Sequence, residues 1–410
     1  EEQPWAEAVV IQDEKIIFVG DSTEALSQRK GSTRMITRPD GMVLPGFIDS
    51  HFHLKNYGKR LDQINLKGLK SLKEIEFSES PIMSTYLLFF AIGKISSKEI
   101  KTKQGVLIRV WATDNKEIFS DFALETSVKL LDYFESYFGV KYPLPKLDHI
   151  AIPDFAAGAM ENWGCISYRE NALLVDPSNS SLQTKQLVAA IIAHEMAHMW
   201  FGDLVTMSWW NDLWLNESFA SWMGDKAISN IYPEWDVWTK FILDDTNRAF
   251  ELDALDNSHP IEQAVDNPDE IGQLFDAISY SKGASLIRML ENYLGESTFQ
   301  KGIQIYIKTH AYKNTTTDDL WNALSINSDT NVKNLMDNWT TKTGFPLIEL
   351  TKNNNNEYEL NQTKFSFNEN FENQSDWIIP IKYYSKTNNE KIENSKLISN
   401  KSNKIPRKNA

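Results

Sequence analysis

Two histidines flank a glutamate in the run His194-Glu195-Met196-Ala197-His198. On an α-helix, residues i and i+4 share a face, so both imidazoles could bind one metal ion at about 2.0–2.1 Å. Glu195 then lies one position round the helix, too far to ligate comfortably but close enough to act on a water at the metal. The pattern therefore predicts a hydrolytic zinc site with Glu195 as the general base, provided that this segment is helical.

A catalytic zinc ion needs a third protein ligand and an open coordination position. Glu217 is the candidate, because it follows His198 after eighteen intervening residues and begins a second stretch with helical spacing. The two histidines alone could also lie on the surface of an ordinary helix, and the glutamate at this spacing argues against that. We therefore expect one Zn²⁺ per chain, bound by His194, His198 and Glu217.

Hydrophobic periodicity predicts the elements that position these residues. Apolar residues recur at helical spacing before His194, Ser180 or Ser181 can cap that helix, and Gly202 follows its end. Helical spacing is also predicted over 120–138 and, for most of its length, over 181–345. Strands are predicted within 5–20, 42–48, 81–111 (a buried strand at 86–93 included) and 365–383.

Further motifs accompany the zinc pattern in order along the chain. They are Gly158-Ala159-Met160-Glu161-Asn162, the run from Trp200 to Thr206, and the run from Trp210 to Glu217. Together they resemble the gluzincin aminopeptidases related to aminopeptidase N, over about residues 76–385. The resemblance implies an α+β fold: a thermolysin-like, mostly helical zinc peptidase domain with a β-rich N-terminal segment and a small C-terminal β-sandwich. It also implies a zinc metallo-aminopeptidase that hydrolyses the N-terminal peptide bond of peptides through metal-activated water.

The resemblance implies roles for residues away from the metal. An aminopeptidase must bind a free α-ammonium, and a carboxylate beside the zinc can do so with a charge-assisted hydrogen bond. Glu161 has this role in the family, within the substrate-binding segment formed by Gly158, Ala159, Met160, Glu161 and Asn162. Tyr280 resembles the catalytic tyrosine that donates a hydrogen bond to the tetrahedral intermediate. Asp212 either orients a ligand histidine or is a capping or surface acid.

The first 75 residues have a different character. The run from Pro45 to His53 resembles the strand that opens an amidohydrolase barrel, where an H-x-H pair binds metal. Period-two spacing puts His51 and His53 on one strand face. Such a barrel needs about 250 residues and more ligands from later strands, whereas the later histidines lie in aminopeptidase-like segments. We expect His51 and His53 to be metal-free, and an amidohydrolase-type metal hydrolase acting through them is the alternative function.

The chain is therefore expected to contain four parts, joined first between Ser71 and Phe77. They are an amidohydrolase-like N-terminal β fragment (1–75), a zinc aminopeptidase catalytic domain (76–345) with a β lead-in (76–115), a β-sandwich remnant (346–389), and a tail (390–410) expected to be disordered because it is rich in Asn, Ser and Lys. The family's N-terminal β-domain and C-terminal helical domain are not recognisable in the sequence. A catalytically impaired zinc-binding protein is thus a further alternative.

Composition narrows the class of partner. Apolar residues make up 41% of the 410 residues, enough for a globular core, and the net charge of −14 argues against nucleic acid. The most apolar run, 86–93, is too short for a membrane span, which needs about 20 residues. One cysteine, Cys165, favours a reducing compartment or a disulfide-free secreted protein, and of these we expect a cytoplasmic location. The expected partners are peptides with a free N-terminus, and no feature predicts an oligomeric state.

Overall fold

The computed structural model describes residues 8–12, 15–33, 35, 80–352, 358–367, 377–387, 390–399 and 402–405. The chain separates into two compact units, Glu1–Phe47 and Ile48–Ala410. In the first unit, β1 (Ala8–Gln12) pairs antiparallel with β2 (Lys15–Gly20), and α1 (Ser22–Ser27) follows, which confirms the two strands predicted within residues 5–20. His51, His53, the predicted strand at 42–48 and the predicted join at 71–77 lie outside the described residues.

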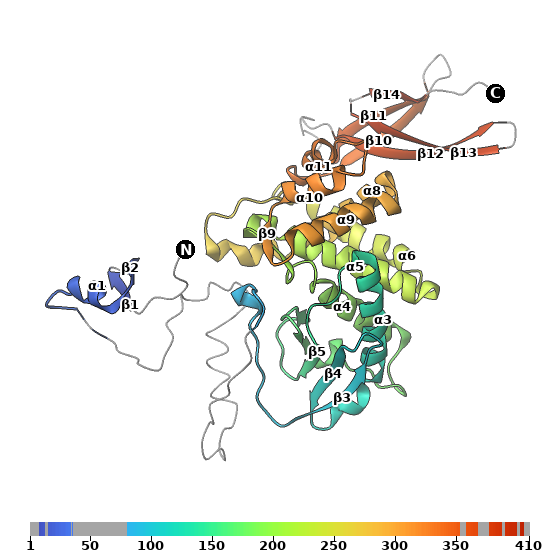
Figure 1. Ribbon diagram of the computed structural model, residues 1–410. Helices are drawn as coiled ribbons and strands as arrows, with labels where there is room; N and C mark the ends of the chain where they lie inside the picture. The colour runs from blue at the N-terminus through green and yellow to red at the C-terminus, as the bar shows by residue number, and fades with distance from the viewer. Residues whose placement is uncertain are drawn as a thin grey trace. The chain divides into compact units, whose positions relative to one another are not determined.

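The second unit combines helices with sheets, which confirms the α+β class. Its largest sheet has the spatial order β3-β4-β5-β7-β6, and Figure 1 labels its strands β3, β4 and β5. The three central strands run parallel, and the outer strands pair antiparallel with them. The strands are β3 (Ile95–Lys101), β4 (Leu107–Thr113), β5 (Lys146–Ile152), β6 (Ala159–Met160) and β7 (Cys165–Arg169). Because β6 is last in this order, one edge of it has no neighbouring strand among the described residues.

Helices make up most of the chain between residues 121 and 340, which confirms the helices predicted at 120–138 and over 181–345. Ser181 caps the helix that carries the histidines, since its side chain accepts a hydrogen bond from the backbone N–H of Thr184. The helices are α3 (Asp121–Phe138), α4 (Leu182–Ala197), α5 (Trp214–Ile231), α6 (Val237–Phe241), α7 (Asn247–Asp253), α8 (Gly283–Leu294), α9 (Glu296–His310), α10 (Thr317–Ser325) and α11 (Val332–Thr340). Single π-helical turns lie at η6 (Ile242–Thr246) and η8 (Ile278–Lys282).

Helices α4 and α5 form the centre of this domain and approach each other closely. A Cβ atom built on Gly224 of α5 would lie 3.0 Å from the backbone nitrogen of His194 in α4. Beyond this contact, the ring of Phe201, which follows α4, stacks on that of Phe219 in α5 with centroids 4.5 Å apart, and both side chains are at most 1% exposed. The two helices therefore touch where a residue without a side chain allows it, and a buried aromatic pair joins them nearby.

The apolar run at 86–93 is not the buried strand that the sequence predicted. Residues Thr85–Leu87 form a 3₁₀ turn (η1), and Leu88, Phe90 and Ile92 are 45–50% exposed. A strand is stable only when a neighbouring strand satisfies its backbone groups, and no strand pairs with this segment among the described residues. Within the run, Leu87 is buried and Tyr86 lines a narrow cavity.

The C-terminal strands form two small sheets. One has the order β10 (Pro346–Lys352), β11 (Tyr358–Lys364), β14 (Ser402–Ile405), and the other is the hairpin of β12 (Ile379–Thr387) and β13 (Glu390–Ile398). The prediction of a disordered tail from residue 390 is therefore wrong for β13 and β14. Backbone pairing does not require large side chains, and Ile398 at the end of β13 is fully buried opposite Ile379.

No helix in the described ranges is both long enough and apolar enough to cross a membrane.

The contact at Gly224 generates a test of the fold. Gly224→Ala should lower the free energy of unfolding by about 1–3 kcal/mol, because the new methyl group meets α4 backbone, which cannot rotate away as a side chain can. Denaturant unfolding would measure it. Gly272→Ala is the matched control, since nothing lies within 4 Å of the Cβ position there. Equal midpoints for the two variants would contradict the close helix contact.

Candidate metal centre

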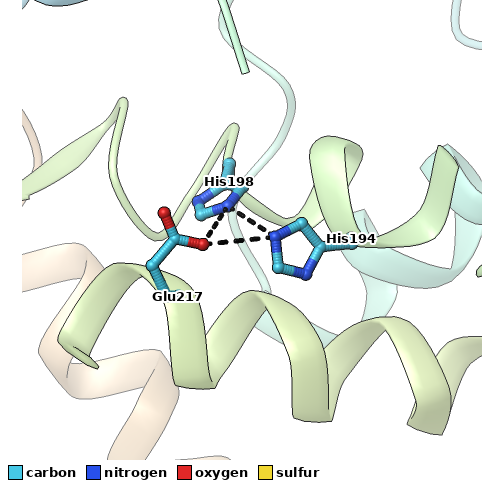
Figure 2. Close-up of side chains that lie close together, drawn as sticks. All are labelled: His194, His198 and Glu217. Atoms are coloured by element: carbon cyan, nitrogen blue, oxygen red, sulfur yellow. Dashed lines mark hydrogen bonds and ion pairs between the residues drawn. The ribbon is translucent and has the colours of Figure 1, made fainter. Parts of the chain in front are cut away.

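The three predicted ligands converge at the junction of α4 and α5 (Figure 2). His194 lies in the last turn of α4, His198 immediately follows that helix, and Glu217 lies in the first turn of α5. The Nε2 atoms of His194 and His198 are 3.0 Å apart. Oε2 of Glu217 lies 3.3 Å from Nε2 of His194 and 3.4 Å from Nε2 of His198. Two imidazole nitrogens and one carboxylate oxygen therefore form a compact triangle.

This triangle fits a zinc ion. Bonds of about 2.0–2.1 Å in a tetrahedral site place neighbouring ligand atoms about 3.3–3.4 Å apart, close to the three observed separations. The donor set of two histidines and one glutamate is one that catalytic zinc sites use. The Oε2 atom of Glu217 is covered from solvent and makes no hydrogen bond of standard geometry to the described residues, although the two imidazole nitrogens lie 3.3 and 3.4 Å away. A buried carboxylate oxygen of this kind is costly unless a cation compensates it.

The other ring nitrogens fix the orientation of the two histidines. Nδ1 of His198 lies 2.9 Å from the carbonyl oxygen of Phe201, and Nδ1 of His194 lies 3.3 Å from Oγ of Ser221. A proton on Nδ1 of His198 can be donated to that carbonyl, which leaves Nε2 as the metal-binding atom. Asp212 does not orient either ligand: its carboxylate accepts hydrogen bonds from the backbone N–H and hydroxyl of Thr317, where α10 begins. Of the roles expected for Asp212, these contacts support capping, here of the start of α10.

Negative charge is concentrated around the centre. Glu161, Glu195, Asp203 and Glu217 are each at most 7% exposed. Burial raises the pKa of Glu195 and of Asp203 well above the usual range, and the Glu161 charge acts in the same direction on both. Burial opposes ionisation of Glu217 too, but the adjacent His198 and His194 outweigh it and lower the pKa of Glu217. A site built this way favours cations, both a metal ion and a cationic group of a ligand.

Glu195 lies where the sequence predicts a general base. It belongs to α4 between the two ligand histidines, is 7% exposed, and its Oε2 makes no hydrogen bond to the described residues. A carboxylate with a raised pKa is a better proton acceptor at neutral pH.

Tyr280 reaches the centre from the π-helical turn η8. Its ring stacks on that of His194, with centroids 5.9 Å apart and planes 18° from parallel. Burial raises the pKa of the Tyr280 hydroxyl, and the charges of Glu217 and Glu161 raise it further, so the hydroxyl stays a donor. The buried ion pair of Lys282 with Asp253, 2.8 Å long, anchors the turn to α7.

The segment Gly158 to Asn162 reaches the centre from the edge of the sheet. Ala159 and Met160 form β6, Gly158 is exposed, and Glu161 follows at 7% exposure. Met160 and Glu161 line a narrow cavity together with the ligand Glu217. The Asn162 side chain is committed within the protein, because its amide nitrogen donates to the Leu87 carbonyl (3.2 Å) and its oxygen accepts from Ser167 (2.8 Å).

The other residues that line this cavity were missed by sequence reasoning. They are Tyr86, Trp210, Leu213 and Phe275. None carries a charge or belongs to a metal-binding pattern, and Tyr86 lies within the run that was interpreted as a buried strand. The available signal was proximity in sequence: Trp210 and Leu213 precede Glu217 by seven and four residues, and Phe275 precedes Tyr280 by five.

Comparison with known proteins gives consistent results. Residues 122–339 match the peptidase family M1 domain. The chain is 50% identical over 310 residues to "Aminopeptidase M1-A" of Oryza sativa subsp. japonica, with 76% of this chain and 35% of that protein covered. It is 46% identical over 313 residues to "Puromycin-sensitive aminopeptidase" of Caenorhabditis elegans (75% and 33% covered). Over 330 residues it is 44% identical to "Aminopeptidase 2, mitochondrial" of Saccharomyces cerevisiae (80% and 34% covered). The chain spans about a third of the length of these curated relatives.

The metal centre predicts a simple stoichiometry. The purified chain should hold about one zinc per molecule, and His194→Ala or Glu217→Ala should abolish it, because two remaining ligands do not hold a zinc ion tightly. Elemental analysis after dialysis would measure the zinc content. A joint change of His51 and His53 to Ala is the control and should leave the zinc content unaltered. Full zinc in either ligand variant would refute the assignment, and loss of a second metal in the control would revive the amidohydrolase alternative.

Proposed function

The chain belongs to peptidase family M1, and from this premise we propose that it is a zinc aminopeptidase that removes the N-terminal residue of peptides. The observation that carries the proposal is the placement of Glu161: a buried carboxylate that shares one cavity with the metal ligand Glu217. A metal ligand triangle alone is compatible with any zinc hydrolase. A second carboxylate beside it is suited to a substrate that brings a positive charge to the metal, as a free peptide N-terminus does.

His194, His198 and Glu217 would hold the zinc ion, which when bound supplies Lewis-acid polarisation of the scissile carbonyl and acidifies water. Glu195 then takes the proton of the attacking water. Its raised pKa and its position between the two histidines support this role. The same carboxylic acid can later deliver that proton to the leaving amine, because a general base regenerates itself by acting as the acid.

Tyr280 donates a hydrogen bond to the oxygen that becomes negatively charged as the carbonyl carbon turns tetrahedral. Its hydroxyl stays protonated because burial and two nearby carboxylates raise its pKa, and the stacking of its ring on His194 keeps it beside the ligands. Such a donor contributes to catalysis only if it is held in place before the reaction. The ion pair of Lys282 with Asp253 supports this by fixing the turn that carries Tyr280.

The substrate-binding segment serves two purposes in this proposal. Glu161 pairs with the α-ammonium and so sets which peptide bond reaches the metal. The backbone of Gly158 and Ala159 guides the peptide as an added strand, because β6 has an open edge among the described residues and extended peptides pair with such edges. Met160 lines the cavity, and Asn162 holds the segment to Leu87 rather than contacting the substrate.

Two finer structural interpretations accompany the proposal. We infer a thermolysin-like arrangement for the helical catalytic domain, supported by the ligands from two adjacent helices, α4 and α5. We infer also that the two C-terminal sheets are a β-sandwich remnant, supported by the two hydrogen bonds by which Gln362 of β11 binds the backbone of Trp377 beside β12. The amidohydrolase alternative is not favoured, because the family match lies entirely after His51 and His53.

The role of Glu195 is tested by Glu195→Gln. This change should keep the zinc and lower kcat by about 10²–10⁴-fold, because it removes the proton acceptor without touching a ligand. Hydrolysis of an aminoacyl-anilide with parallel metal analysis would measure both quantities. Glu125→Gln, an exposed position on α3, makes the same chemical change away from the site and should leave kcat unaltered. Activity of the Glu195 variant within a few-fold of the parent would exclude the role.

The experiment that tests the proposed function compares the cleavage of one peptide with and without an N-terminal acetyl group. The parent should cleave only the free-amine form efficiently. Glu161→Ala should lower kcat/KM for that form by about ten- to a hundredfold, the range for a hydrogen bond to a charged group, and narrow the gap to the acetylated form. Glu161→Gln separates the loss of charge from the loss of packing. If the parent cuts both forms equally, or cuts internal bonds first, it is not an aminopeptidase.

A further inference from the structure

Tyr86 comes from outside the matched family domain and reaches the cavity beside the metal centre. It lies on η1, 36 residues before the start of the match at residue 122, and lines the cavity with Glu161 and Glu217. Its ring packs against Trp210 with centroids 6.0 Å apart. The zinc-binding residues, the base and Tyr280 all act without it, so its function is not explained by the proposed mechanism.

The Tyr86 hydroxyl is buried without a well-formed hydrogen bond. Its oxygen is covered from solvent and makes no hydrogen bond of standard geometry among the described residues, but the Glu161 carboxylate lies close enough to act on it as an acceptor. A buried hydroxyl without a well-formed hydrogen bond destabilises the protein relative to one that is bonded, so such a group calls for an explanation. Burial raises the pKa of Tyr86 well above the usual range, and of the surrounding charges Glu161 acts on it most strongly. The hydroxyl is thus a permanent donor whose foremost charged neighbour is the Glu161 carboxylate.

A hydrogen bond joins the backbone after Tyr86 to the segment that carries Glu161. The side chain of Asn162 donates to the carbonyl of Leu87, and the neighbouring Tyr86 and Glu161 line the same cavity. The Leu87 side chain is 2% exposed, so its burial also anchors the turn. Neighbouring contacts of this kind leave the Tyr86 ring little freedom to move away from Glu161.

We propose that Tyr86 is a positioning residue for amine recognition: its hydroxyl donates a hydrogen bond to the Glu161 carboxylate when that carboxylate holds the ammonium of the substrate. This inference rests on the proposed aminopeptidase function. A phenol is suited to the task, because it restrains one carboxylate oxygen while leaving the negative charge available to the ammonium. Hydrogen bonds of this kind are often long in the free enzyme and tighten only when substrate binds.

The test measures binding rather than turnover. Leucine hydroxamate and its desamino analogue, 4-methylpentanohydroxamate, present the same zinc-binding group and differ by the amine. The ratio of their dissociation constants on the zinc-loaded chain, measured by calorimetry, therefore reports amine recognition alone. Tyr86→Phe should reduce this ratio by about threefold to tenfold, the range for one net hydrogen bond, with zinc content and melting temperature unchanged.

Two further variants separate positioning from packing. Tyr137→Phe is the matched control, because Tyr137 also has a buried hydroxyl without a partner but does not line the cavity, and its ratio should equal that of the parent. In a Glu161→Ala background, adding Tyr86→Phe should change the ratio no further, because the partner is gone.

Each remaining outcome overturns the inference in a distinguishable way. A parent that binds both hydroxamates equally refutes amine recognition, and with it both the aminopeptidase function and the role of Tyr86. A parent that prefers the amine while Tyr86→Phe keeps the full ratio refutes only the role of Tyr86. Weaker binding of both ligands by the same factor would assign Tyr86 a packing role in its place.

Discussion

The close contact between α4 and α5 is the constraint on which the rest of the site depends. Two ligands come from the end of one helix and the third from the start of the other, so the metal-binding atoms meet only if the helices nearly touch. Gly224 allows that approach, and the stacked rings of Phe201 and Phe219 join the end of α4 to α5. The packed helix pair therefore preorganises the three metal-binding side chains, which a single continuous sequence motif could not do by itself.

The second feature is the density of buried carboxylates. The carboxylates of Glu161, Glu195, Asp203 and Glu217 would repel one another when charged, and burial raises the pKa of Glu195 and of Asp203. A divalent cation and a substrate ammonium are the two positive charges that offset this cost. The proposed metal ion and the ammonium of the proposed substrate would therefore each relieve part of the repulsion that the fold creates among these carboxylates.

Where sequence reasoning failed, the missing information was the partner of a segment. The run at 86–93 has the composition of a buried strand, yet the described residues offer it no strand to pair with. Its Leu87 carbonyl instead accepts a hydrogen bond from the segment that carries Glu161. The segment after 390 has the composition of a disordered tail, yet β12 offers it a complete ladder of backbone hydrogen bonds. Composition reports what a segment could bury, and pairing depends on what lies next to it.

The sequence by itself was sufficient to predict the residues on which the proposed chemistry depends. Helical spacing around His194 and His198, the later Glu217 and the ordered motifs were sufficient to predict the zinc ligands, the α+β class and the family, because these depend on local periodicity and residue type. Only the tertiary structure decided that Asp212 caps α10, that Asn162 is committed to Leu87, and that Tyr86 faces Glu161. Those contacts join residues up to 105 positions apart. No local pattern records them, because they exist only once the helices and the sheet edge have packed together.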